Sequence, residues 1–232
     1  LFGAVLRRAV PTPGWIAADL HLQQAPSVDA DISLESRVVA VAAEGVELAV
    51  ATDHYVVTDL EPVVRELVAS GALAKPLLSV AGTEVSTVGN RFGHFNVFPM
   101  PPGTNVEYED TTPARLFASA RRASPDGLLQ VNHPRWDPNL GYFTRFDVDT
   151  ATGKGKRPGF DPRFDLLEVY NGGDRMDLSK IERGLGHART PPTVRVARPG
   201  QVHLGQVALR APGPPLDRLV DARAVRAGRG TE

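Results

Sequence analysis

The chain has 232 residues, of which 42% are hydrophobic and 23% charged, and its formal net charge is −1 at pH 7. A chain of this length can bury a substantial core, and its charge balance gives no signal for binding nucleic acid or an anionic membrane. The absence of cysteine excludes disulfides and thiolate metal sites, so a metal would need histidine and carboxylate ligands. No apolar run is long enough to span a bilayer, and the sequence leaves the compartment undecided.

The pattern of apolar residues predicts an α/β fold. Short apolar runs bounded by turn residues predict strands at 15–20, 48–52, 77–81, 92–98, 128–132 and 164–170. Helical spacing predicts helices over 34–44, 62–69 and 112–123, capped by Ser33, Asp59 and Thr112. Units of strand, helix and parallel strand bring the ends of several strands to one rim of a sheet, where α/β folds keep their chemistry.

Three segments lie outside this regular pattern. We interpret residues 1–13 as a lead-in from a truncated upstream region. Residues 136–163 are rich in Gly, Pro, Asp and basic residues, which is typical of a functional lid or a disordered insertion. From residue 187 on, Phe, Trp, Tyr, Ile, Lys, Asn and Ser disappear, and no helical or strand period is sustained. We therefore expect one domain at 14–186, followed by a divergent, disordered or out-of-frame tail at 187–232.

Four histidines and a glutamate mark similar positions on different strands. His21, His54, His94 and His133 each stand at or near the end of a predicted strand, and Glu84 follows another. A lone histidine is more often a surface or core residue than a ligand, but five such residues at equivalent positions predict a common site. Imidazole and carboxylate groups together suit Zn, Mn or Fe and do not distinguish between these metals.

Other residues near these strand ends have more than one interpretation. Asp19 and Asp53 are candidates for accepting the hydrogen bond that fixes the tautomer of a ligand histidine, and equally for strand-end or capping roles. Arg135 is a candidate for binding an anionic group of a substrate, against the role of a solvated loop residue. Trp136 and Tyr142 could line a pocket, but packing within the long loop is the simpler interpretation.

Six short motifs contain these residues and follow one another along the chain. They are Asp19-Leu20-His21, Pro26-Ser27-Val28-Asp29, Thr52-Asp53-His54, Gly82-Thr83-Glu84, Gly93-His94 and Asn132-His133-Pro134. Longer stretches occur at Glu44-Gly45-Val46-Glu47, Ala51-Thr52-Asp53-His54, Phe92-Gly93-His94-Phe95-Asn96 and Glu168-Val169-Tyr170-Asn171-Gly172. The motifs resemble the PHP (polymerase and histidinol phosphatase) superfamily, and the longer stretches resemble its CehA/McbA branch, the carbaryl-esterase-like metallohydrolases. The resemblance covers about Gly14 to Gly173. It implies a distorted (β/α)7 TIM-like barrel, here incomplete at its C-terminus, with metals at the ends of its strands.

The resemblance also implies a role for each matching residue. His21 matches the first histidine of the family's His-x-His motif, and Glu84 matches the carboxylate that bridges two metals. His94 and His133 match other ligands of one of those metals. Gln23 stands where the second histidine of the motif is expected, and its neutral amide is a weak ligand for such metals.

A further metal position is implied, and one family element is missing. Asp29 stands where the family places a His or Asp for this metal, and His54 matches its second ligand. The family's late Ser-Asp-x-His element has no counterpart, because it would fall after Gly184, where the composition changes. Of three possible metal positions, only the set of Glu84, His94 and His133 is therefore complete.

The resemblance implies a hydrolase that uses divalent Zn, Mn or Fe and cleaves an ester or phosphoester bond of a small molecule through a metal-activated water. Glu84 would be a catalytic residue, and Arg135 is a candidate for a second one because it directly follows His133-Pro134. Gln23 and the missing late element favour an alternative, a catalytically impaired relic or binding module that still holds metal. A sugar- or peptide-binding domain without metal would require the histidine pattern to arise by chance. No nucleic-acid partner is expected.

Overall fold

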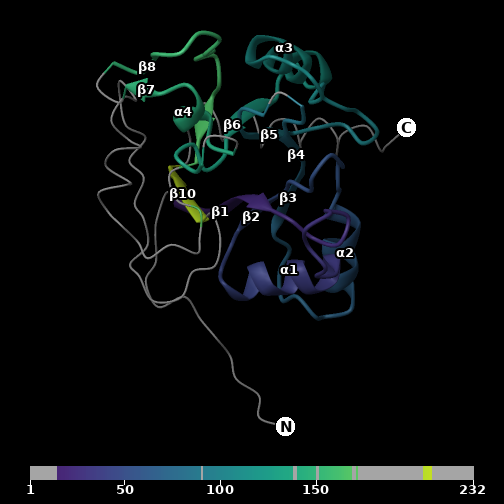
Figure 1. Ribbon diagram of the computed structural model, residues 1–232. Helices are drawn as coiled ribbons and strands as arrows, with labels where there is room; N and C mark the ends of the chain where they lie inside the picture. Colours follow the sequence, from purple (N-terminus) through teal and green to yellow (C-terminus); the bar gives the residue numbers. More distant parts are fainter. Residues whose placement is uncertain are drawn as a thin grey trace.

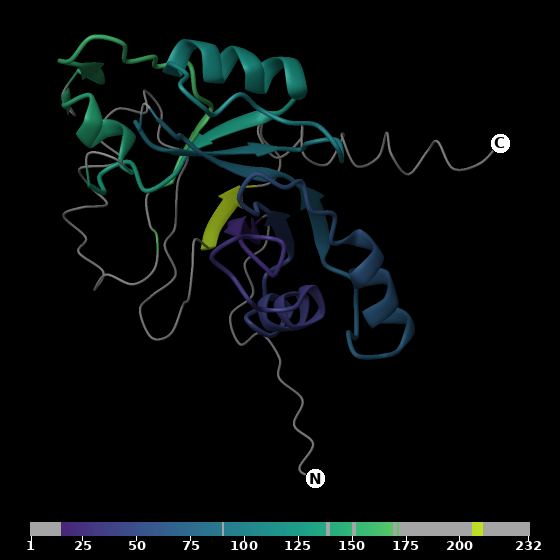
Figure 2. The same ribbon diagram turned by 45° about the vertical axis from the view of Figure 1, so that its right-hand side comes forward.

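The computed structural model describes residues 15–89, 91–137, 140–149, 152–168, 171 and 206–210. Within these residues, two β-sheets pack together and helices cover their outer faces, so the fold is a layered mixture of α and β structure (Figures 1 and 2). None of the described helices is long and apolar enough to cross a membrane.

The first sheet contains the parallel strands. Its members are β1 (Trp15–Leu22), β2 (Leu48–Ala51), β3 (Leu78–Ala81) and β10 (Gln206–Arg210), in the order β10-β1-β2-β3. β1, β2 and β3 are parallel, whereas β10 runs antiparallel to β1. The crossover helices α1 (Leu34–Ala43) and α2 (Glu61–Ala69) cover one face of this sheet (Figure 2), where Val38, Val41 and Val64 are buried.

The second sheet is mostly antiparallel and lies under α3 (Figure 2). Its members are β4 (Thr83–Ser86), β5 (His94–Phe98), β6 (Leu128–Val131) and β9 (Leu166–Leu167), in this order. Each of the pairs β4–β5 and β5–β6 is antiparallel, and β9 is parallel to β6. The outer face packs on α3 (Pro113–Ala123) and α4 (Tyr142–Arg145) in an aromatic-rich core. A separate hairpin consists of β7 (Val148–Asp149) and β8 (Lys154–Gly155).

Gly82 joins the two sheets. β3 ends at Ala81 and β4 begins at Thr83, so one run of chain passes from the first sheet into the second. A Cβ atom at Gly82 would lie 2.9 Å from Phe98 Cβ and 3.0 Å from the Ala51 carbonyl oxygen, closer than such atoms pack. A residue without a side chain therefore allows the strands of both sheets to approach each other here.

Alternation of side chains along the strands fills the space between the sheets. Its apolar part consists of Ala18, Leu20, Leu48, Val50, Val80, Phe98 and Leu128. Along β5, residues two apart point to the same face, so Phe98, Asn96 and His94 lead from this apolar cluster to a polar region. The same change runs from Leu128, at the start of β6, to Asn132, just after its end. The interior thus has an apolar end and a polar end.

The three predicted helices and most predicted strands are confirmed. Ser33 and Thr112 cap α1 and α3 as expected, because each hydroxyl accepts a backbone N–H from the first turn. The N-cap of α2 is Leu60 rather than Asp59, whose carboxylate instead accepts from the backbone N–H of Glu61.

The strand arrangement differs from the prediction. The described residues form no closed barrel, so of the expected TIM-like barrel only the α/β class is confirmed. β4 was not predicted, because its sequence Thr-Glu-Val-Ser contains a single apolar residue, Val85, and so lacks the apolar run by which the other strands were found. β5 was expected among parallel strands but runs antiparallel to both of its neighbours.

The later part of the chain also differs from the prediction. The long segment 136–163 contains α4, β7 and β8, and the strand expected at 164–170 is represented by the short β9. β10 lies in the tail at 187–232, where no strand was expected. β10 consists of five residues that pair with the edge of β1. Such a short strand does not need a long apolar period, so the pattern of apolar residues could not predict it. Residues 1–13 and the rest of the tail lie outside the described residues.

Candidate metal centre

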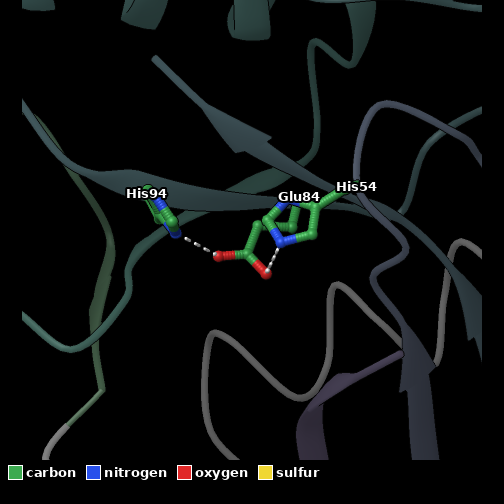
Figure 3. Close-up of side chains that lie close together, drawn as sticks. All are labelled: His54, Glu84 and His94. Atoms are coloured by element: carbon green, nitrogen blue, oxygen red, sulfur yellow. Dashed lines mark hydrogen bonds and ion pairs between the residues drawn. The ribbon is translucent and has the colours of Figure 1, made fainter. Parts of the chain in front are cut away.

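The carboxylate of Glu84 occupies the polar end of the interior and is only 1% exposed. His54 and His94 lie on either side of it, each beside a different carboxylate oxygen (Figure 3). His94 Nδ1 is 3.1 Å from Oε1, and His54 Nε2 is 3.6 Å from Oε2. One ligand atom from each of the three residues lies within 4.8 Å of the other two, so the group could hold a metal ion.

Two further histidines face the same carboxylate. His21 Nε2 is 2.8 Å from Glu84 Oε2, and His133 Nε2 is 3.9 Å from Oε1. Two atoms that bind one zinc ion at about 2 Å each lie no more than about 4 Å apart. The separations of all four imidazoles from Glu84 are therefore compatible with metal ions shared with this carboxylate.

The antiparallel course of β5 explains how His94 reaches this group. His94 is the first residue of β5, whereas His133 follows the end of β6. In an antiparallel pair, the start of one strand lies beside the end of its neighbour. The predicted rim is therefore present at these residues, although the strand that carries His94 runs in the opposite direction to the one expected.

Asp29 also joins the group, from the loop between β1 and α1. Its Oδ2 atom is 3.3 Å from His54 Nε2, and its Oδ1 accepts a hydrogen bond from Ser27 Oγ. The other ring nitrogen of His54, Nδ1, is 3.0 Å from Ser86 Oγ, which leaves Nε2 to face Asp29 and Glu84. The structure thus brings all six of the expected ligands together: His21, Asp29, His54, Glu84, His94 and His133.

Gln23 contacts Glu84 as a donor. Its side-chain nitrogen lies 2.6 Å from Glu84 Oε2 and donates a hydrogen bond to it. In this arrangement the amide supplies a hydrogen bond to the carboxylate in place of the metal ligand that a histidine would supply there.

A chain of amides beneath Glu84 was missed by sequence reasoning. Asn132 Nδ2 donates to Glu84 Oε1 at 3.0 Å and to Asn96 Oδ1 at 2.8 Å. Asn96 Nδ2 in turn donates to the Leu20 carbonyl at 2.9 Å, and Gln130 Nε2 donates to Asn132 Oδ1 at 3.1 Å. The available signal was the presence of amides at inward positions of strands that are otherwise apolar. These bonds hold the Glu84 carboxylate in one orientation.

Glu168 is a second buried carboxylate that the predicted site lacked. It follows β9, is 5% exposed, and lies with Oε1 at 2.8 Å from His21 Nδ1. Its Oε2 accepts from the backbone N–H of His133 at 2.7 Å and from Asn171 Nδ2 at 3.1 Å. The signal in the sequence was a charged residue that interrupts an apolar run.

The roles considered for Asp19 and Asp53 toward histidine rings are not observed. Asp19 Oδ1 accepts from the backbone N–H of His21 at 3.1 Å, and Glu168 instead contacts the ring of His21. The carboxylate of Asp53 accepts from the backbone and side-chain nitrogens of Gln24, at 2.7 and 2.6 Å. Both carboxylates therefore order the backbone near the site. Burial raises the pKa of Asp19 to about 7.

The ionisation of the site is dominated by His21 and the two glutamates. Burial raises the pKa of Glu84, but the charge of His21 and hydrogen bonds from the site histidines outweigh burial, so the pKa lies well below its usual range. Burial lowers the pKa of His21, but Glu84 and Glu168 raise it by more, to well above its usual range. The pKa of Glu168 is lowered because the charge of His21 and hydrogen bonds outweigh burial. The site therefore favours positive charge between its carboxylates.

Arg135 contacts the segment that follows it. Its guanidinium donates to the Val148 carbonyl at 3.0 Å and lies over the ring of Phe143, 5.4 Å from the ring centroid. The proposed role of Arg135 in binding an anion stays a prediction.

Trp136 and Tyr142 differ in their relation to the site. Trp136 is 55% exposed, and its ring lies 4.6 Å from that of His133 at an interplanar angle of 84°. Tyr142 is fully buried, and its hydroxyl donates to the Asp161 carbonyl and accepts from the Asp161 N–H. Tyr142 therefore packs in the core, whereas Trp136 lies at the edge of the site.

The residues present fit a divalent metal. The imidazole nitrogens and carboxylate oxygens around Glu84 are donors that Zn, Mn and Fe accept. Among the described residues, the buried Nδ1 atom of His133 has no hydrogen-bond partner, and its Nε2 atom lies 3.9 Å from Glu84 Oε1, so neither ring nitrogen is held by a hydrogen bond that would keep it from a metal. His133 also has a positive φ of 26°, an uncommon backbone conformation that is often found at functional sites.

Comparison with known proteins adds little. No protein-family model matches the chain, and no curated protein matches it. Among solved structures, the chain is similar to a protein from Bifidobacterium adolescentis described as a "putative metal-dependent phosphoesterase". The two are 14% identical, the alignment covers 72% of this chain and 81% of the other, and the TM-score is 0.48. Similarity at this level carries no conclusion about activity.

Proposed function

We propose that this protein is a PHP-type, CehA/McbA-like hydrolase that uses divalent metal ions to cleave an ester or phosphoester bond of a small molecule. The observation that carries the proposal is that four imidazoles surround one buried carboxylate, that of Glu84. A divalent metal bound there would lower the pKa of a coordinated water toward neutrality and polarise the substrate oxygen.

The protein's own residues would divide the work as follows. His54, Glu84 and His94 form the most compact set of donors and would hold one metal. His133 belongs with Glu84 and His94 in the set expected from the sequence. Its Nε2 atom is 3.9 Å from Glu84 Oε1, which is farther than the nitrogens of His54 and His94 are from this carboxylate. His21 would bind metal beside Glu84 Oε2, whereas His133 lies beside Oε1. The set of His54, Glu84 and His94 is therefore the first to test, because its ligand atoms all lie within 4.8 Å of one another.

The approach to the site is marked by its exposed carboxylate. The Asp29 side chain is 50% exposed, whereas that of His54 beside it is 10% exposed. Substrate and water would thus enter past Asp29, and the carboxylate could accept a proton or bind a further metal at this side. The buried amide of Asn132, on the opposite side, would keep the Glu84 carboxylate oriented during the reaction.

A second candidate function is metal binding with little turnover. The observation that favours it is the hydrogen bond from Gln23 to Glu84 Oε2, at the place where the resemblance implies a histidine ligand. An amide donor there occupies one oxygen of the carboxylate and adds no nitrogen ligand, so a metal beside His21 would bind weakly.

The test begins with metal analysis of the purified protein. The metal-free protein would then be reloaded with Zn²⁺ or Mn²⁺ and assayed on 4-nitrophenyl acetate, 4-nitrophenyl phosphate and bis(4-nitrophenyl) phosphate. We expect metal-dependent hydrolysis of one of these, which Glu84→Ala and His94→Ala abolish. Asp165→Asn is the control, because Asp165 is a carboxylate whose partners, Leu129 and Arg121, lie outside the site. Metal binding without hydrolysis would support the second function, and absence of metal binding would overturn both.

A further inference from the structure

We infer that Glu168 is a positioning residue that fixes two of the candidate metal ligands, His21 and His133, with one carboxylate. This inference rests on the proposed function, since the residues that Glu168 holds are proposed to bind metal. Glu168 itself does not face Glu84. Its Oε1 is 2.8 Å from His21 Nδ1, on the side of the ring away from Glu84, which is 2.8 Å from Nε2.

The contact with His21 selects the nitrogen that faces the site. A histidine that binds metal through one ring nitrogen usually donates its other N–H to a carboxylate or carbonyl, which fixes the ring and its tautomer. His21 Nδ1 meets Glu168, so Nε2 is the atom presented to the centre. In the implied His-x-His motif, two histidines would bind this metal. Because Gln23 supplies no imidazole, His21 is the one histidine of the motif in this chain, and metal binding depends more strongly on its orientation.

The contact with His133 acts on the backbone. Glu168 Oε2 accepts from the His133 N–H at 2.7 Å, and His133 has a φ of 26°. A residue in this uncommon conformation persists only where its surroundings hold it. Glu168 is itself held against β6, because its own N–H donates to the Val131 carbonyl at 2.9 Å. The carboxylate thus links β1 to the end of β6 through two ligands that are 112 residues apart in sequence (133 − 21).

Both oxygens of Glu168 are needed for this arrangement. A carboxylate offers two acceptor oxygens, one to the ring of His21 and one to the backbone of His133, whereas a glutamine offers one acceptor and an NH₂ donor. Glu168→Gln therefore loses one of the two contacts and places a donor against a donor. Glu168→Asp keeps both oxygens on a side chain one methylene shorter, so it should restore part of the effect.

Zinc affinity is the first test, measured on the full chain by competition with a chromophoric chelator. We expect Glu168→Gln to weaken Zn²⁺ binding about 10- to 100-fold, the usual effect of removing such a partner, with Glu168→Asp intermediate. If Glu168 acts through His21, the loss caused by Glu168→Gln should be at least about threefold smaller in a His21→Ala background. An equal loss in both backgrounds would overturn the role through His21. An equal loss in the control Asp165→Asn would mean a general structural role and overturn the whole inference.

Amide hydrogen exchange tests the inference without metal. In metal-free protein, Glu168→Ala removes both oxygens and should speed exchange of the His133 amide by about tenfold or more, as expected for loss of a buried hydrogen bond. Asp165→Asn should instead affect the Leu129 amide, which donates to Asp165 Oδ2 at 2.8 Å. If the parent protein binds no zinc, the proposed function fails, and exchange at His133 still decides the role of Glu168. Unchanged protection of His133 in Glu168→Ala would overturn it.

Discussion

The two ends of the space between the sheets share strands β1, β5 and β6 but are held together by different forces. At the apolar end, Leu20, Leu48 and Phe98 pack without directional contacts. At the polar end, the side chains of Glu84 and Asn132 have hydrogen-bond partners from separate strands. The apolar end requires volume and shape, which several residues could supply. The polar end requires particular atoms at particular places, so it should tolerate far less change.

The largest effect should come from the centre of the polar end. Glu84→Gln removes the negative charge that faces His21, and breaking a buried ion pair typically costs about 3–5 kcal/mol. Metal binding should be lost as well. Urea unfolding of metal-free protein in the presence of a chelator measures the first effect, and zinc titration measures the second. A loss of stability below about 1 kcal/mol would be typical of a weak ion pair on the protein surface. It would contradict the expectation that the polar end tolerates little change.

A comparable loss of stability should follow from the apolar end, but without loss of metal. Leu48 is 1% exposed and belongs to the apolar cluster, so Leu48→Ala should cost about 2–5 kcal/mol through lost burial and the cavity created. Zinc affinity of the folded variant should stay within about threefold of the parent value, because the two sites share no partner. A larger change in affinity would show that the two ends are coupled.

The dependence of stability on pH should come from the polar end. The pKa of Glu84 is lowered in the folded protein, so its contribution is present above its ordinary value of 4.5 and is lost as the pH falls below that value. The pKa of His21 is raised, so its contribution is complete below 6.5 and is lost as the pH rises through the folded pKa.

Metal-free protein should therefore gain most from this pair between pH 4.5 and 6.5 and lose stability above 6.5. Unfolding free energies measured at intervals between pH 5 and pH 9 would show this slope. His21→Ala should reduce the slope above pH 6.5, whereas Leu48→Ala should leave it unchanged. An equal slope in the parent and His21→Ala proteins would assign the pH dependence to other groups.

The smallest effect concerns Gln23. Gln23→Ala removes one donor from Glu84, which keeps its contacts with His21, His94 and Asn132, so zinc affinity should change little. Gln23→His adds an imidazole at the same place and should raise the number of zinc ions bound per chain, because imidazole binds such metals better than an amide. Metal analysis after gel filtration distinguishes the two. If Gln23→Ala abolished metal binding as completely as Glu84→Ala, Gln23 would be a true ligand.

The three longest helices, most strands of the two sheets and most members of the site could be predicted from the sequence alone. Helical spacing and the caps Ser33 and Thr112 located α1 and α3, because these signals act within a few residues. The repeated occurrence of histidine at strand ends was sufficient to predict a common group around Glu84. Asn96 and Glu168 also carried a signal, a polar residue in an apolar strand, but this signal does not reveal the partner.

Three features could be known only from the folded chain, namely the direction of β5, the single-residue join at Gly82 and the pairing of β10 with β1. These features depend on contacts between residues far apart in the chain. The spacing of apolar residues within one segment carries no information about such contacts. The same holds for the partner of His21, which is Glu168, 147 residues away, and not the neighbouring Asp19. Spacing along the chain shows which groups can reach a rim. Which of them meet is decided by the packing of the sheets, because hydrogen bonds require atoms to lie within about 3 Å in the correct direction.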